Sequence, residues 1–135
     1  MIDTSVWGWA RRSPEVEREL RDRVEADRAA TCPPAMLEML HSARDVEEFR
    51  VMRSGLEALV VVPVDEHVWD RAVDVYEDLA AQGGAHQRQV SHPDLLIAAA
   101  AEAAGLPVLH YDEDYDRIAA VTGQPMRWVR PRGSL

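Results

Sequence analysis

The sequence predicts one α/β domain, in which a mainly parallel sheet is flanked by helices. Short apolar or β-branched runs alternate along the chain with segments that open on helix-capping residues, and this alternation is typical of a parallel sheet. With 135 residues, 47% of them hydrophobic and 29% charged, the chain is long enough for one core. There are no internal repeats, so we expect a single domain over residues 1–135.

Local signals predict where the helices of the first half begin. Asp3 can cap a short helix, and Ser13 before Pro14 is a strong start, because serine caps a helix and proline suits its first position. Pro33 opens a helix that is apolar nearly all round and is therefore expected in the core, whereas Gly55 is expected to break the next one. The expected elements are a strand at 1–2, helices at 3–9 and 14–24, a strand at 29–32, helices at 33–43 and 45–53, and a buried strand at 59–64.

The second half has equally clear starts and stops. Asp65 is expected to cap a long helix, and Ser91 with Pro93 to open another that Gly105 ends. Between these two helices lies the most loop-like stretch of the chain. The expected elements are a helix at 65–81, a loop at 82–89, a helix from 91 to 105, a strand at 108–111, a short helix at 116–121 and an edge strand at 127–129.

Composition narrows the setting in which the protein works. The longest apolar stretch, residues 95–101, is far shorter than the roughly 20 residues of a membrane span, and the beginning of the chain does not resemble a signal peptide. Cys32 is the only cysteine and is expected in the core, so no internal disulfide forms. We therefore expect a cytoplasmic protein with no membrane segment.

The net charge of −9 at first argues against a nucleic-acid ligand. However, all 15 basic residues are arginines, nine of which cluster in residues 11–28 and 127–132, and a bound metal ion inverts the field around carboxylates. The arginines can equally be no more than the solvated faces of helices. The local charge can thus differ from the net charge.

Four acidic positions stand where surface acids are rare. Asp3 and Asp112 directly follow predicted strands, Asp94 begins a helix, and Glu38 lies inside an apolar run. The carboxyl ends of parallel strands meet at one edge of a sheet, and helices that pack back on the sheet begin there. We therefore expect these acids, with Asp114 as a fifth, to converge on one cleft, where a divalent metal compensates their charge.

Each acid also has a simpler interpretation. Asp3 can be a helix cap, Asp94 a partner of the helix dipole, and residues 112–116 a solvated acidic turn. The spacing of these last acids also resembles a calcium loop, but Arg117 and Gly123 stand where such a loop needs glycine and glutamate. No zinc spacing is present, so magnesium is the expected ion, with manganese as a substitute.

Four motifs occur in register along the chain: Ile2 to Trp7, Cys32 to Leu40, Pro93 to Ala100 and Leu109 to Ile118. Together they resemble a PIN domain, and within that superfamily the VapC toxins. The resemblance covers essentially the whole chain, although Tyr115 stands where phenylalanine is more frequent. It implies a magnesium-dependent ribonuclease of a toxin–antitoxin pair, usually a homodimer, that a VapB antitoxin silences. The implied metal acids are Asp3, Glu38, Asp94 and Asp112, with Asp114 as a fifth.

Further roles are hypotheses at this stage. Thr4 or Ser5 is expected to orient water or ligand, and Arg12, His86 and Arg88 to approach the RNA backbone, although an exposed-loop role suits the last two equally well. A groove for an antitoxin helix can involve Trp7, Trp9, Met36 and Met39, for which core packing is the default, and His92 and His110 are expected to be structural.

Two competing function classes stay open. The first is a non-catalytic PIN-like module whose acidic cleft receives an arginine of a partner. The second is a phosphatase with Asp3 as its nucleophile, which is disfavoured because Ser5 stands where a second aspartate is needed.

Overall fold

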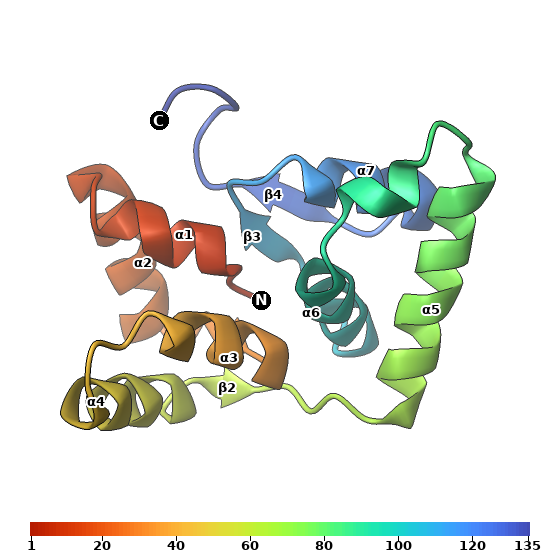
Figure 1. Cartoon of the computed structure of the whole chain (residues 1–135). Coiled ribbons are helices and arrows are strands. Elements are labelled where there is room, and N and C mark those ends of the chain that lie inside the picture. The colour runs from red at the N-terminus through yellow and green to blue at the C-terminus, as the bar shows by residue number, and fades with distance from the viewer.

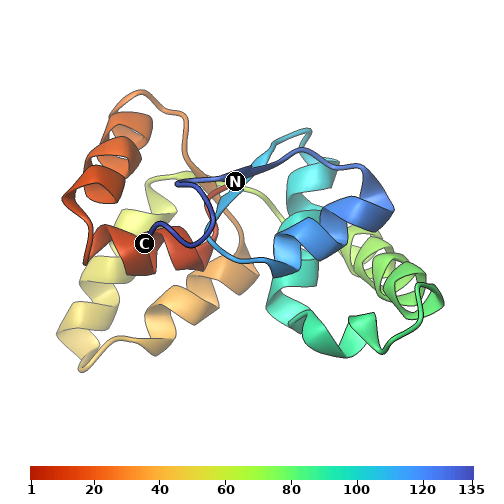
Figure 2. The same cartoon turned by 90° about the horizontal axis from the view of Figure 1, so that it is seen from above.

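A computed structural model describes all of residues 1–135 and has the expected α/β architecture. Short strands run through the middle of the molecule, with the helices of the N-terminal half on one side and those of the C-terminal half on the other (Figures 1 and 2). The helices are α1 (Thr4–Ala10), α2 (Pro14–Glu25), α3 (Pro33–His41), α4 (Val46–Glu57), α5 (Glu66–Ala81), the 3₁₀ turn η1 (His86–Gln89), α6 (His92–Ala103) and α7 (Asp114–Thr122). The strands are β1 (Ala30–Thr31), β2 (Val60–Val61), β3 (Val108–His110) and β4 (Met126–Trp128).

The strands pair in parallel, as predicted. β1 pairs with β2, β3 pairs with β4, and Ile2 forms a parallel bridge with Leu109 of β3. The backbone N–H of Ile2 also donates to the carbonyl of Ala30 at 2.9 Å, so the first residues of the chain link the two strand pairs. Asp3, the residue after this bridge, is thereby fixed in the middle of the sheet.

Most helix starts are those that the sequence predicts. Asp3, Ser13, Asp65 and Ser91 each cap a helix by accepting a hydrogen bond from a backbone N–H. The central helix is α6, whose residues from Asp94 to Ala101 are all buried. Its apolar surface on every side explains why it lies in the core, where it packs against α3, α5 and α7.

Three predictions about the first half are wrong. The helix α3 is not buried all round, because it packs only on one side and leaves Leu37 69% exposed. The strand β2 is an exposed edge strand, because β1 is its only neighbour in the sheet and both its valines face outward. Gly55 does not end α4: the helix continues because Leu56, the next residue, is buried against the rest of the fold.

The other differences are shifts of element ends. α7 begins at Asp114, two residues before the expected start, because the Asp112 side chain accepts a hydrogen bond from the Asp114 N–H and turns the chain there.

No helix of the protein has the length and the hydropathy that crossing a membrane requires. Cys32 is fully buried, as expected.

Candidate metal centre

The predicted acids come together at the edge where the strands end. One oxygen each of Asp94, Asp112 and Asp114 lies within 4.8 Å of the other two. Asp3 joins this group through a shared hydrogen-bond donor, and Glu38 lies close enough for its charge to affect Asp94. Four segments that are distant in the sequence therefore meet in one carboxylate cluster.

Asp3 is held on both of its carboxylate oxygens. Its Oδ2 accepts hydrogen bonds from the backbone N–H of Ser5, at 2.9 Å, and from the Ser5 hydroxyl. Its Oδ1 accepts a hydrogen bond from the hydroxyl of Tyr115 at 2.6 Å. Asp3 is thus a helix cap, as the simpler interpretation predicts, but it also belongs to the cluster: Oδ2 caps α1, and Oδ1 faces the other acids.

Glu38 reaches the cluster from α3. The hydroxyl of Thr4 donates to its Oε2 at 3.1 Å, which orients the carboxylate toward the beginning of α1. Partial burial, together with the negative charges of Asp3 and Asp112, raises the pKa of Glu38. No arginine pairs with this acid, and its hydrogen-bond donor is the hydroxyl of Thr4.

Asp94 is the most strongly perturbed acid of the cluster. It lies in the first turn of α6 and is only 9% exposed, and Ser91 donates to its Oδ2 at 2.6 Å. Burial, reinforced by the charges of Asp3, Asp112 and Glu38, raises the pKa of Asp94 to about 7. A favourable helix dipole alone would lower this pKa, so the simple dipole interpretation does not account for the residue.

Asp112 and Asp114 form the solvent-facing part of the cluster. Burial and the neighbouring Asp112 charge raise the pKa of Asp114, although Arg117 forms an ion pair with it. Asp116 is exposed and accepts from the indole N–H of Trp128 at 2.9 Å, and Glu113 pairs with Arg117 and Arg132. Asp112 and Asp114 of the acidic stretch therefore face the cluster, whereas Glu113 and Asp116 form contacts on the protein surface.

The predicted substrate-contacting residues fall into two groups. Thr4 and Ser5 touch the cluster directly, because their hydroxyls donate to Glu38 and Asp3. Arg12 lies beyond the far end of α1, where its guanidinium stands 5.8 Å from the ring centroid of Trp9. His86 and Arg88 belong to η1, which ends two residues before Ser91, and neither forms a hydrogen bond or an ion pair with an acid of the cluster.

Two residues of the centre were not among those predicted to form it. Ser91 was expected only to start a helix, yet its hydroxyl binds the carboxylate of Asp94. In the sequence, Tyr115 differs from the family pattern only by replacing phenylalanine, yet in the structure its hydroxyl contacts both Asp3 and Asp94. The sequence signal for this role is a polar aromatic residue between Asp114 and Asp116.

The donor set fits a hard divalent cation. The three grouped ligand atoms are all carboxylate oxygens, and oxygen ligands of this kind suit Mg²⁺ and Mn²⁺. The raised pKa values of Glu38, Asp94 and Asp114 all have burial and neighbouring negative charge among their causes, and a cation would relieve the repulsion. Asp94, Asp112 and Asp114 are the residues best placed to hold it.

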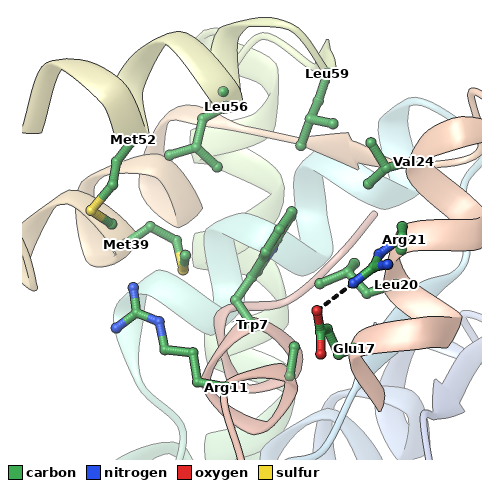
Figure 3. A pocket seen from close by; sticks show the side chains of 12 residues that line it. Trp7, Arg11, Glu17, Leu20, Arg21, Val24, Met39, Met52, Leu56 and Leu59 are labelled. Carbon is green, nitrogen blue, oxygen red and sulfur yellow. Dashed lines mark hydrogen bonds and ion pairs between the residues drawn. The ribbon is translucent and has the colours of Figure 1, made fainter. Parts of the chain in front are cut away.

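A second surface feature lies away from the acids. An open, mainly apolar groove of about 620 Å³ is lined by residues of α1, α2, α3 and α4, and the side chain of Trp7 lies near its middle (Figure 3). Arg21 and Glu17 form an ion pair at its rim. Of the residues expected around such a groove, Trp7 and Met39 line it, whereas Trp9 packs edge to face on Tyr111 at 5.4 Å and Met36 is not part of the lining.

Comparisons with known proteins agree with this geometry. The family model described as PIN domain matches residues 1–121. The chain belongs to the PIN-domain family, and its relatives within it are VapC ribonucleases.

Two relatives from Mycobacterium tuberculosis match along nearly their whole length. Ribonuclease VapC18 is 44% identical over 99% of this chain and 97% of its own, and Ribonuclease VapC51 is 41% identical over 100% and 96%. Among solved structures, the DNA-bound VapBC of Salmonella typhimurium superposes with a TM-score of 0.74 at 17% identity, over 96% of this chain and 97% of that chain. That identity is low, so the match supports the fold alone.

Proposed function

We propose that this protein is a magnesium-dependent endoribonuclease, the VapC-like toxin of a toxin–antitoxin pair. The observation that carries this proposal is the cluster of Asp94, Asp112 and Asp114, whose oxygens lie within 4.8 Å of one another at the end of the sheet. Relatives that share 44% and 41% of its residues are named ribonucleases, which supports RNA as the substrate. The enzyme acts in the cytoplasm, where transcripts are found.

The residues of the site divide the work among themselves. Asp94, Asp112 and Asp114 would hold the cation, and Asp3 and Glu38 would add negative charge beside it. The bound cation supplies the positive charge that activates water and stabilises charge on the phosphodiester group. Thr4, Ser5 and Ser91 fix the carboxylates of Glu38, Asp3 and Asp94 by hydrogen bonds, which keeps their geometry ready for the ion.

The RNA backbone approaches from the side of η1. His86 and Arg88 lie in the turn that precedes Ser91 by two residues, and Arg88 is exposed, so its charge is available to a phosphate group. These two residues therefore position the substrate, whereas a bound divalent cation would reduce the local negative charge of the acidic cluster, which would otherwise repel it. Arg12 is too far along α1 for the scissile group and is assigned to a more distant part of the RNA.

The antitoxin binds in the apolar groove. Trp7, Met39 and Met52, which are only partly buried, offer it apolar surfaces, and such a groove of about 620 Å³ suits the apolar face of a partner helix. Structures that match this fold are named as VapBC complexes, including those of Salmonella typhimurium and Rickettsia felis, which supports a VapB-like partner.

A homodimer forms through the exposed side of α5. Trp69 and Val73 are 54% and 63% exposed, and with Tyr76 they form one apolar stripe on this helix. If two copies of α5 pack antiparallel about Val73, Asp70 faces Tyr76 of the second copy, and no two acids oppose each other. Val73→Glu would then shift the protein from dimer to monomer in analytical ultracentrifugation.

Cleavage of RNA by the purified protein tests the proposed activity. Wild type should cut RNA in Mg²⁺ and stop when the metal is chelated, and Asp94→Asn should lower the rate about a thousandfold, because it removes a cation ligand. Asp116→Asn is the matched control, since this exposed acid of the same stretch faces Trp128 rather than the cluster. Its rate should stay within about twofold of wild type.

Two results would contradict the assignment. If Asp94→Asn cuts RNA as fast as wild type, the cluster does not hold the catalytic cation. If wild type binds its antitoxin tightly but neither cuts RNA nor binds a divalent cation, the protein is the non-catalytic module whose acids receive an arginine.

A further inference from the structure

Tyr115 places a hydroxyl group at the centre of the acidic cluster. Its side chain is 0% exposed, and its ring lies against His110, with the ring centroids 4.9 Å apart. The hydroxyl contacts Asp3 Oδ1 at 2.6 Å and Asp94 Oδ1 at 3.2 Å. A ring that only filled the core would not need this hydroxyl, so phenylalanine would serve packing equally well.

The hydroxyl acts as a donor. A phenol has one proton, and the shorter distance assigns it mainly to Asp3. A phenol is ordinarily protonated at neutral pH, so the oxygen carries this proton. A neutral donor thus stands between two acids that would otherwise repel each other.

No other side chain hydrogen-bonds to both of these acids. Ser5 binds Oδ2 of Asp3, and Ser91 binds Oδ2 of Asp94, so each serine controls the carboxylate next to it in the chain. Tyr115 binds the opposite oxygen of both. It therefore connects Asp3, which follows the β-bridge at Ile2, to the group formed by Asp94, Asp112 and Asp114.

On the basis of the proposed function, we propose that Tyr115 is a positioning residue for the metal centre: its hydroxyl holds Asp3 and Asp94 at a fixed spacing, so that both carboxylates act on the same cation. Hydrogen bonds to metal-binding carboxylates orient them, and their loss typically costs about 10- to 100-fold in metal affinity. Without the hydroxyl, Asp3 and Asp94 can rotate apart, and the cation loses a preorganised site. Tyr115 itself touches neither the cation nor the RNA.

Tyr115→Phe tests this role, since it removes one oxygen and keeps the ring. We expect Mn²⁺ and Mg²⁺ to bind about tenfold or more weakly in calorimetry, and the stabilisation by Mn²⁺ in thermal melting to shrink accordingly. The Mg²⁺ concentration for half-maximal RNA cleavage should rise by the same factor, while the rate at saturating Mg²⁺ recovers to within about threefold. Loss of packing alone would not give this split between affinity and maximal rate.

Tyr111→Phe is the matched control. The Tyr111 hydroxyl accepts a hydrogen bond from the backbone N–H of Leu135 and touches no acid, so its removal should leave the metal affinity unchanged. The role of Tyr115 is refuted if Tyr115→Phe binds Mn²⁺ within twofold of wild type, or if its rate falls equally at all metal concentrations. Failure of wild type to bind a cation would instead refute the proposed function itself.

A measurement on wild type keeps the test decisive even if Tyr115→Phe does not fold. The buried hydroxyl proton should exchange slowly enough to be observed by NMR, with a strong contact to the ring of Tyr115. Addition of Mg²⁺ should shift the resonance of this proton, because a cation bound to the acceptor carboxylates weakens the hydrogen bond that they accept from the hydroxyl. A hydroxyl resonance that does not respond to saturating Mg²⁺ would overturn the proposal.

Discussion

The acidic cluster and the apolar groove are opposite kinds of site on one small domain. In the cluster, charged groups are packed where charge is costly, and Asp3 and Asp94 are nearly as buried as the core. In the groove, apolar side chains such as Trp7 and Met39 line open space, where contact with water is unfavourable. The isolated chain therefore carries an unfavourable free energy at both sites, from buried negative charge in the cluster and from exposed apolar surface in the groove. A cation would relieve the first, and an apolar helix would cover the second.

The largest expected effect separates the two sites by function. Asp3→Asn should lower RNA cleavage about a thousandfold, because it removes one charge beside the cation, while the affinity for a VapB-like antitoxin stays within about threefold. Single-turnover cleavage and antitoxin titration on the same preparation measure both. A large loss of antitoxin affinity would mean that the partner also occupies the acidic cluster, and the two sites would not be independent.

The next effect concerns stability and pH. The pKa of Asp94 is about 7 in the folded protein, against an ordinary value of 3.8, so the folded state keeps a proton that the unfolded chain releases as pH rises from about 4 to 7. The metal-free protein should therefore be most stable at the acidic end of this window and lose a few kcal/mol of stability by pH 8.

Chemical denaturation at several pH values, with and without Mg²⁺, measures this loss. Mg²⁺ should restore much of the stability at pH 8, and Asp94→Asn should flatten the pH profile because its side chain does not titrate. A wild-type stability that rises steadily between pH 5 and pH 8 without metal would contradict the picture of a cluster under electrostatic repulsion.

The groove should respond to loss of apolar surface. Trp7→Ala removes the aromatic ring near the middle of the groove and should weaken antitoxin binding about 30- to 100-fold, because buried tryptophans dominate such interfaces. RNA cleavage should be unchanged. Isothermal titration with the antitoxin peptide and an RNA assay give the two numbers, and an unchanged affinity would place the antitoxin elsewhere.

The smallest effect belongs to the rim of the groove. Glu17 and Arg21 form an ion pair whose side chains are 54% and 62% exposed, and exposed pairs of this kind contribute little. Glu17→Ala should change antitoxin affinity less than about threefold, and the change should fade at high salt. An effect as large as that of Trp7→Ala would mean that charge, not apolar contact, governs the groove.

The sequence predicts the cluster far better than the groove. Asp3 and Glu38 are conspicuous because each stands where the surrounding residues are apolar, and parallel-sheet geometry then explains why they meet Asp94 and Asp112. The groove has no such contrast, because Met39 and Met52 in an open groove have the same sequence pattern as they would in a core. Only the packing of α1, α2 and α4 decides which apolar residues stay uncovered.

The wrong predictions have the same physical origin. An apolar helix such as α3 was expected to be covered on all sides, but coverage depends on neighbours that distant segments supply, and none covers Leu37. The same holds for the two valines of β2, which lie at the edge of the sheet. The role of Tyr115 was missed because its partners, Asp3 and Asp94, are 112 and 21 residues away in the chain.

A crystal structure grown with Mn²⁺ and measured at the manganese absorption edge tests the metal centre most directly. We predict an anomalous peak bound by carboxylate oxygens of Asp94, Asp112 and Asp114, on the side that Asp3 and Glu38 face, and no such peak in Asp94→Asn. Mn²⁺ bound only at other carboxylates, or an unchanged peak in Asp94→Asn, would contradict the assignment of these acids to one metal centre.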